Sequence, residues 1–313
     1  MRVTALAGGV GAGKFLRGLV RTVPPEEVTA IVNTGDDIEV HSLHVSPDLD
    51  SVMYWLAAVA DRERGWGREG ETFHTTEELR RLGATGAWFG LGDLDLATHL
   101  LRTSWLRSGR SLSEVTEELC QRFGVRTRLL PMTNDPAPTR IEIVESGRVI
   151  DLHFEEYWVQ RGARDEIKSI RYEGADRARP GPGVLDALQE AETIVIGPSN
   201  PIASIGPILA IPGLRDLVAA RRDRVIGVSG IVGGAPLGGM ADRLLPAAGV
   251  EVTAAGVAGF YRDLMTAWVI DEVDRELAPR IESLGLRVRV TDTIMVDDAA
   301  AESLARTALE LVP

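Results

Sequence analysis

Residues 3–15 read Val3-Thr-Ala-Leu-Ala-Gly-Gly-Val-Gly-Ala-Gly-Lys-Phe15, an apolar run followed by four glycines within six residues. The glycines and Lys14 match the P-loop spacing G-x-x-x-x-G-K, but Phe15 stands where that motif has the hydroxyl that holds Mg²⁺. A helix is predicted over residues 14–21. The stretch therefore predicts a strand, a tight turn and a helix N-terminus, an arrangement whose free N–H groups and dipole favour an anion. The alternative is a plain strand-to-helix connection.

Three more β-branched runs recur between helical stretches, at residues 28–32, 193–196 and 224–228. Strands that alternate with helices indicate a parallel sheet covered on both faces. We therefore predict an α/β protein with a doubly wound, Rossmann-like, mostly parallel sheet.

The region between the second and third runs has a different sequence pattern. Residues 48–124 are predicted to be mostly helical, with a helix after Ser111 or Ser113, and residues 140–155 alternate like a β-hairpin. We expect one domain over residues 1–313. Its core is predicted to span 1–47 and 184–313, and its helical and hairpin elaboration about 48–183, ending in a loop at 177–183.

Composition excludes several classes of function. The formal charge of −12 argues against nucleic-acid and anionic-membrane surfaces, which depend on clustered Lys and Arg. Cys120 is the only cysteine, so no intrachain disulfide forms. No apolar stretch approaches the roughly 18–20 residues of a membrane span. We expect a cytoplasmic protein.

Acidic residues gather where early elements end or begin. Asp36 and Asp37 follow the second run, at the strand end where an α/β sheet binds ligands, and carboxylates there suit a hard cation such as Mg²⁺. Asp48 and Asp93 each begin a predicted helix, so a capping role explains them equally well.

Asp50 and Asp95 are less easily explained as caps, because each lies two residues, about 200°, around the helix from the first acid. His99 follows Asp95 by four residues on the same face and could transfer a proton. An ordinary core or surface histidine is the alternative interpretation.

Two later loops, residues 197–206 and 229–239, are rich in glycine and also follow predicted strands. In the first, Ser199 and Asn200 could hold a phosphate or a base. Connecting loops without a ligand are the alternative. A dinucleotide fingerprint fits less well, because its third glycine would fall at Lys14 or Leu16.

Together, six ordered motifs resemble the CofD family, the 2-phospho-L-lactate transferases of deazaflavin coenzyme F-420 biosynthesis. They lie at residues 7–18, 33–37 (Asn-Thr-Gly-Asp-Asp), 46–50 (Ser-Pro-Asp-Leu-Asp), 91–99 (Leu-Gly-Asp-Leu-Asp-Leu-Ala-Thr-His), 131–135 and 197–201. The resemblance implies a Mg²⁺-assisted reaction in which a hydroxyl of the precursor Fo attacks a guanylyl-activated three-carbon acid, releasing GMP. It also suggests a homodimer.

Motif and resemblance together assign expected roles to named residues. We expect Asp50 and Asp37 in catalysis, Asp36, Asp37 and Asp50 at the metal, Asp50, Asp93, Asp95 and His99 at Fo, and Gly8, Gly9, Gly11, Lys14, Asn33, Ser199 and Asn200 at the nucleotide.

The chain departs from the family pattern at Leu94, Asn134 and Gly230, and Leu94 removes a usual positive charge. The related YvcK-like regulators, which bind nucleotide sugars, are the non-enzyme alternative, but residues 35–42 differ from their usual sequence after the second strand, which favours the transferase. A nicotinamide-dependent oxidoreductase is the second enzyme alternative. The acid transferred, whether phospholactate, phosphoenolpyruvate or 3-phosphoglycerate, is left open.

Overall fold

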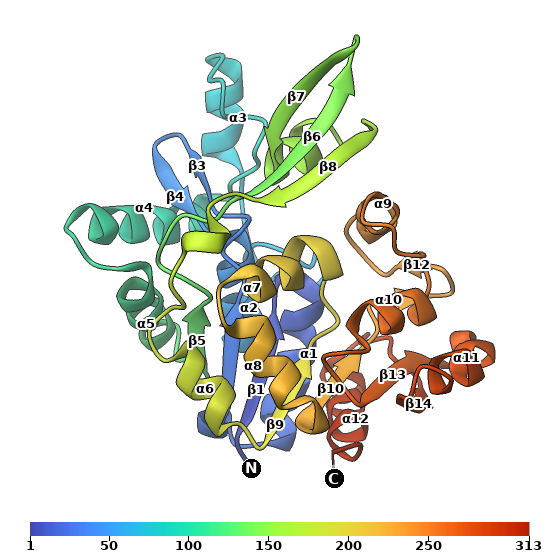
Figure 1. Ribbon diagram of the computed structural model, residues 1–313. Coiled ribbons are helices and arrows are strands. Elements are labelled where there is room, and N and C mark those ends of the chain that lie inside the picture. Colours follow the sequence, from blue (N-terminus) through green and yellow to red (C-terminus); the bar gives the residue numbers. More distant parts are fainter. Residues whose placement is uncertain (313) are drawn as a thin grey trace.

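A parallel sheet of seven strands forms the centre of the computed structural model, which describes residues 1–312 (Figure 1). From edge to edge the strands are β14 (Arg287–Thr291), β13 (Ala267–Asp271), β10 (Val225–Val228), β9 (Thr193–Ile196), β1 (Val3–Ala7), β2 (Val28–Val32) and β5 (Arg128–Pro131). Every neighbouring pair is parallel. The predicted doubly wound α/β fold is confirmed.

The central strands are mostly apolar because they are buried on both faces along almost their whole length. Leu6 packs into one hydrophobic core, whereas Ala5 and Ala7 pack into the other, on the opposite face. The Leu6 core takes side chains from α6 (Val184–Glu190), α7 (Gly206–Ala210), α8 (Leu214–Ala220), α9 (Ala241–Ala247), α10 (Ala254–Tyr261) and α11 (Ala278–Glu282). The second core is covered by α1 (Gly9–Thr22), α2 (Pro47–Leu56), α5 (Leu112–Arg122) and α12 (Asp298–Leu309).

A lobe lies at the end of the molecule opposite the two chain termini (Figure 1). It contains α3 (His74–Arg81), α4 (Asp93–Arg107), the hairpin β3 (Ile38–Val40) with β4 (Leu43–Val45), and a three-stranded antiparallel sheet of β7 (Arg148–His153), β6 (Thr139–Glu145) and β8 (Ile167–Tyr172). Most of this lobe falls in the range 48–183 predicted for a helical and hairpin elaboration, but the β3–β4 hairpin precedes that range, and α2 and α5 within it pack on the main sheet. However, β5, which falls within the 48–183 range expected for it, joins the main sheet beside β2.

Several predicted boundaries agree with the structure. The strands at 3–7, 28–32 and 193–196 match, and a capping box formed by Ser111 and Glu114 opens α5. The first helix begins at Gly9, five residues earlier than predicted, because the glycines themselves are helical. The 229–239 loop contains two short strands, β11 (Ile231–Val232) and β12 (Ala235–Pro236).

Among residues 1–312, no helix alone has both the length and the apolar composition needed to cross a membrane. One pair meets that test only jointly, Pro201–Ala210 with Leu214–Ala220, and it is bent by 94°.

Candidate functional site

The first and second glycine-rich loops pack directly on each other at the carboxyl ends of β1 and β9. The backbone N–H of Gly8 donates to Ser199 Oγ over 3.1 Å. A Cβ on Gly11 would overlap the carbonyl oxygen of Pro198, so only glycine allows this approach. Because β1 and β9 are neighbouring parallel strands, the topology brings the two predicted loops together.

The carboxylate of Asp48 meets the N-terminus of α1, where the sequence predicts a phosphate. It accepts from Asn33 Nδ2 at 2.9 Å and from the Gly9 backbone and Ser204. A Cβ on Gly8 would overlap this carboxylate. The N–H groups and dipole of α1 therefore already face an anion that the protein supplies.

Asp48 belongs to a group of three buried acids with Asp36 and Glu155, which we call the acidic cluster. Burial raises the pKa of Asp48 to about 6 and that of Glu155 to about 8, the second with help from the Asp48 charge. Burial, with Asp48 and Glu155 nearby, also raises the pKa of Asp36 well above its usual range. Within residues 1–312 none of these three acids forms a salt bridge, and such a grouping suits a site for protons or a cation.

Glu155 was not predicted from the sequence. It is the second residue after β7, and its backbone N–H donates to His153 Nδ1 at 3.1 Å. The other ring nitrogen, Nε2, lies 3.1 Å from the backbone oxygen of Asp37, which connects this segment to the end of β2. A buried glutamate beyond a hairpin has no sequence signature, because the contact arises only when the lobe folds over the sheet.

Asp37 lies beside the acidic cluster with one oxygen held and one free. Its Oδ2 contacts His44 Nε2 at 3.0 Å and accepts from Ser46 Oγ at 2.9 Å. Its Oδ1, and likewise Oδ1 of Asp36, is buried and has no hydrogen-bond partner in the described part of the chain. Such orphaned oxygens are unfavourable unless a ligand, a water molecule or a cation meets them.

Asp50 belongs to a different group of buried side chains. We call this group the arginine network, and its members are Asp50, Arg102, His99, Asp95 and Tyr54. Both Asp50 oxygens accept from the buried Arg102 guanidinium, one of them at 2.9 Å. Although burial opposes the charge on Arg102, the Asp50 carboxylate raises the pKa of Arg102 above its ordinary value. Arg102 also contacts His99 Nδ1 at 3.2 Å.

Asp95 and His99 lie on the same face of α4, as their spacing predicts. His99 Nε2 lies 3.4 Å from Asp95 Oδ1, which accepts from Tyr54 Oη at 2.6 Å. Ligand atoms of Asp50, Asp95 and His99 lie within 4.8 Å of one another, as a metal site would require. The Arg102 guanidinium contacts two of these three residues, so a positive charge already occupies this site.

Asp93 does not join either group. Its carboxylate accepts from Thr72 Oγ1 and from the backbone N–H groups of His74 and Thr75, so it caps the start of α3. The start of α4 is capped instead by Glu71, which accepts from the N–H groups of Leu94 and Asp95.

Two further predicted site residues, Lys14 and Asn200, and the neighbouring Phe15 make contacts within the protein. The Lys14 ammonium lies over the Trp55 ring, 5.4 Å from its centroid. Asn200 Oδ1 accepts from the N–H groups of Ile202 and Ala203 and so caps the turn after β9. Phe15 is fully buried in the core beneath α1, which explains why this position is apolar.

The departures at Leu94 and Asn134 differ in consequence. Leu94 is exposed on the first turn of α4. Asn134 Oδ1 accepts from the Ser113 backbone and hydroxyl, both at 2.8 Å, and holds the first turn of α5.

Comparison with solved structures shows the fold. A crystal structure of a UPF0052 family protein from Bacillus halodurans superimposes with a TM-score of 0.61 at 18% identity, covering 98% of each chain.

Comparison of sequences is more specific. A phosphoenolpyruvate transferase of Kitasatospora aureofaciens is 48% identical over 99% of this chain and 98% of its own. A 2-phospho-L-lactate transferase of Methanosarcina mazei is 40% identical over 97% and 98% of the two chains. A family model described as 2-phospho-L-lactate transferase CofD matches residues 3–309. The chain therefore belongs to the CofD family of transferases.

Proposed function

We propose that the chain joins the deazaflavin precursor Fo to a guanylyl-activated three-carbon acid, forming a phosphodiester and releasing GMP. The observation that carries this proposal is the family match along residues 3–309. We further propose phosphoenolpyruvate as the acid, because relatives with that name are up to 48% identical, compared with 40% for the phospholactate enzyme.

The acidic cluster and the neighbouring Asp37 support Mg²⁺ as the cofactor. Asp36 Oδ1 and Asp37 Oδ1 are buried without partners, and a hard cation prefers carboxylate oxygens of this kind. We propose that Asp36 and Asp37 hold the ion, as the sequence suggests. Asp48 is better supported than Asp50 as a third ligand, because Asp50 is already paired with Arg102. When bound, Mg²⁺ would neutralise charge on the transferring phosphoryl group.

The acceptor hydroxyl requires a group that takes its proton. The sequence favours Asp50, but both of its oxygens contact Arg102. We therefore propose that Asp50 positions α2 against α4, and that the proton passes to a group other than the three proposed Mg²⁺ ligands.

Direct displacement fits the side chains at the site. The only cysteine, Cys120, is buried, and burial raises its pKa to about 12, so it is a poor nucleophile. Phosphoryl transfer needs mainly positioning and charge neutralisation, which buried carboxylates with a cation supply.

Incubation with Fo, Mg²⁺ and each of three guanylylated acids, followed by mass spectrometry, tests this function. We expect a phosphodiester of Fo and GMP, formed fastest from the phosphoenolpyruvate donor. Nucleotide binding without product would favour the regulator alternative, and a nicotinamide requirement would favour the oxidoreductase. A homodimer and a cytoplasmic location stay predictions, and light scattering after gel filtration tests the first.

A further inference from the structure

The two oxygens of the Asp37 carboxylate have opposite surroundings. Oδ2 lies 3.0 Å from His44 Nε2 and accepts from Ser46 Oγ at 2.9 Å. Because an ionised carboxylate only accepts hydrogen bonds, His44 donates through Nε2. Oδ1 is buried and has no hydrogen-bond partner within residues 1–312. Two donors therefore occupy one oxygen, and the other is left for a ligand.

Both donors are held by elements of the fold. His44 lies in β4, and its backbone N–H donates to Thr103 Oγ1 of α4 at 2.8 Å. Ser46 is fully buried at the N-cap position of α2, where a serine hydroxyl ordinarily accepts from the first turn of the helix. This hydroxyl makes no such bond and donates to Asp37 instead. The contact with Asp37 thus takes the place of a helix cap.

The number of free carboxylate oxygens influences which cation fits. Mg²⁺ requires nearly ideal octahedral geometry, with oxygens at about 2.0–2.1 Å, whereas Ca²⁺ takes roughly 6–8 oxygens and often both oxygens of one carboxylate. A cation placed against both oxygens of Asp37 would meet the hydrogens that His44 and Ser46 direct at Oδ2. Asp37 can therefore supply one oxygen to Mg²⁺, but it cannot supply two to Ca²⁺.

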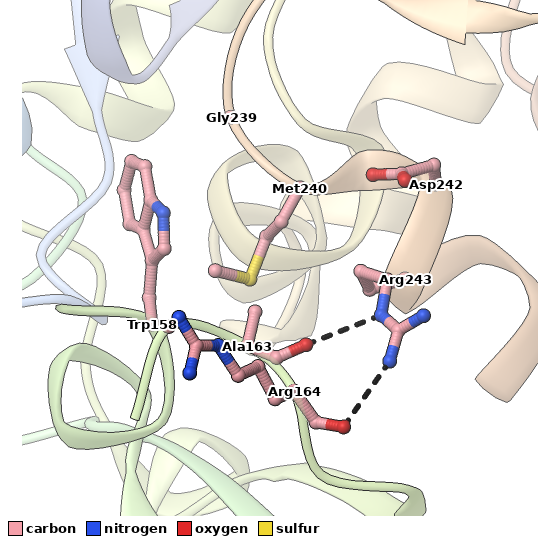
Figure 2. A pocket seen from close by; sticks show the side chains of 8 residues that line it. Trp158, Ala163, Arg164, Gly239, Met240, Asp242 and Arg243 are labelled. Atoms are coloured by element: carbon pink, nitrogen blue, oxygen red, sulfur yellow. Dashed lines mark hydrogen bonds between the residues drawn. The ribbon is translucent and has the colours of Figure 1, made fainter. Parts of the chain in front are cut away.

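A second acid, Asp242, provides a contrast. It lines a cavity of about 510 Å³ between the segment after β7 and the start of α9 (Figure 2). Arg164 and Arg243 line the same cavity, and Arg243 donates to the carbonyls of Ala163 and Arg164 at 3.2 and 3.4 Å. A single carboxylate accompanied by two guanidinium groups does not suit a divalent cation. Asp242 is therefore a control for the loss of an acid outside the proposed metal site.

We propose that His44 and Ser46 restrict Asp37 to one metal-binding oxygen and so make the site selective for Mg²⁺ over Ca²⁺. This inference rests on the proposed function, which assigns Mg²⁺ to Asp36 and Asp37. His44 and Ser46 are positioning residues, because they act through Oδ2 of Asp37 and are not themselves ligands.

Calorimetry with MgCl₂ alone and with CaCl₂ alone tests this assignment. In the double variant His44→Phe with Ser46→Ala, the preference for Mg²⁺ over Ca²⁺ should fall by roughly tenfold, because both oxygens of Asp37 become free. His44→Phe alone should show part of this shift, and its side chain is 34% exposed, so the fold should tolerate the change. His44→Gln retains an N–H donor and should keep most of the preference. His74→Phe, at an exposed histidine of α3, is the matched control.

The outcomes separate selectivity from a merely structural role. If the variants melt like the wild type and keep its ratio of Mg²⁺ to Ca²⁺ affinity, the inference is wrong. It is equally wrong if both cations bind more weakly by the same factor, because the two residues would then only support the fold.

Further outcomes separate the inference from the proposed function. Asp37→Asn should weaken Mg²⁺ binding by at least about tenfold, and Asp242→Asn should leave it unchanged. If Asp37→Asn has no effect, or if the wild type does not bind Mg²⁺, the proposed metal site fails and the inference fails with it. If the selectivity shifts as expected but no phosphodiester of Fo forms, the proposed reaction fails and the selectivity assignment stands.

Discussion

Asp48 and Asp50 lie two residues apart on α2, yet their carboxylates face opposite electrostatic surroundings. Asp48 is held by neutral donors beside two further buried acids, whereas Asp50 is paired with the buried Arg102. Both are at least 94% buried. A turn of about 200° between them is enough to place one in the acidic cluster and the other in the arginine network. The difference shows that a charge-balanced group supports structure, while an unbalanced one is available for ligands.

The largest effect on stability is expected from removing the positive charge of the arginine network. Arg102→Leu leaves the Asp50 carboxylate buried without a partner, so the free energy of unfolding should fall by about 3–5 kcal/mol in urea titrations. The double variant Arg102→Leu with Asp50→Leu should regain much of the loss. Arg107→Leu, an exposed change on the same helix, should shift stability by less than about 0.5 kcal/mol. Equal losses in the two single variants would contradict a special role for the buried pair.

The second test neutralises Asp48 and Asp50 in separate variants. Asp48→Asn should weaken Mg²⁺ binding by at least about tenfold and lower turnover, with little loss of stability, because it removes a charge from a group of like charges. Asp50→Asn should instead lower stability and leave Mg²⁺ affinity close to that of the wild type. Magnesium titration by calorimetry and thermal melting measure both. The reverse pattern would support Asp50 as the metal ligand, as the sequence predicts.

The pH dependence of stability tests the protonation of the acidic cluster. Burial, and then the charge of Asp48, raise the pKa of Glu155 from its ordinary 4.5 to about 8. Between these two pH values the folded state keeps a proton that the unfolded state loses. Stability should therefore fall as pH rises from about 5 to 8, at up to about 1.4 kcal/mol per unit. Glu155→Gln should remove much of this slope in urea titrations at pH 5 and pH 8. An unchanged slope would place the responsible proton elsewhere.

The smallest effect is expected at Asp93, which lies outside both groups. Asp93→Ala removes three hydrogen bonds at the start of α3 and should lower the melting temperature by roughly 1–3 °C. Fo affinity should stay the same if this residue only caps the helix. A clear loss of Fo binding would support the role that the resemblance implies.

Local patterns were sufficient for much of the fold. The runs at 3–7 and 193–196 are strands because apolar, β-branched residues buried on both faces have few alternatives. The hairpin and the capping box at Ser111 depend on neighbours close in sequence. The edge strands β5 and β14 were not predicted, since β5 begins with an arginine and ends with a proline, and β14 alternates arginine with valine.

The candidate site was predictable only where strands end. Asn33, Asp36 and Asp37 follow β2, and the parallel sheet places them beside the loops after β1 and β9. Nothing in the sequence marks Arg102 as buried, because arginine in a helix is usually exposed and its partner is 52 residues away. Glu155 and the pairing of Lys14 with Trp55 depend on long-range packing in the same way.

By itself, therefore, the sequence determined the family, the parallel sheet and the edge of the sheet where carboxylates gather, because these follow from short-range patterns and from motifs in a set order. Only the tertiary structure decided which carboxylate has a cation beside it, that Asp48 occupies the N-terminus of α1, and that Glu155 joins the site. The physical reason is that burial and charge pairing are properties of neighbours in space, and helices and lobes distant in the chain supply those neighbours.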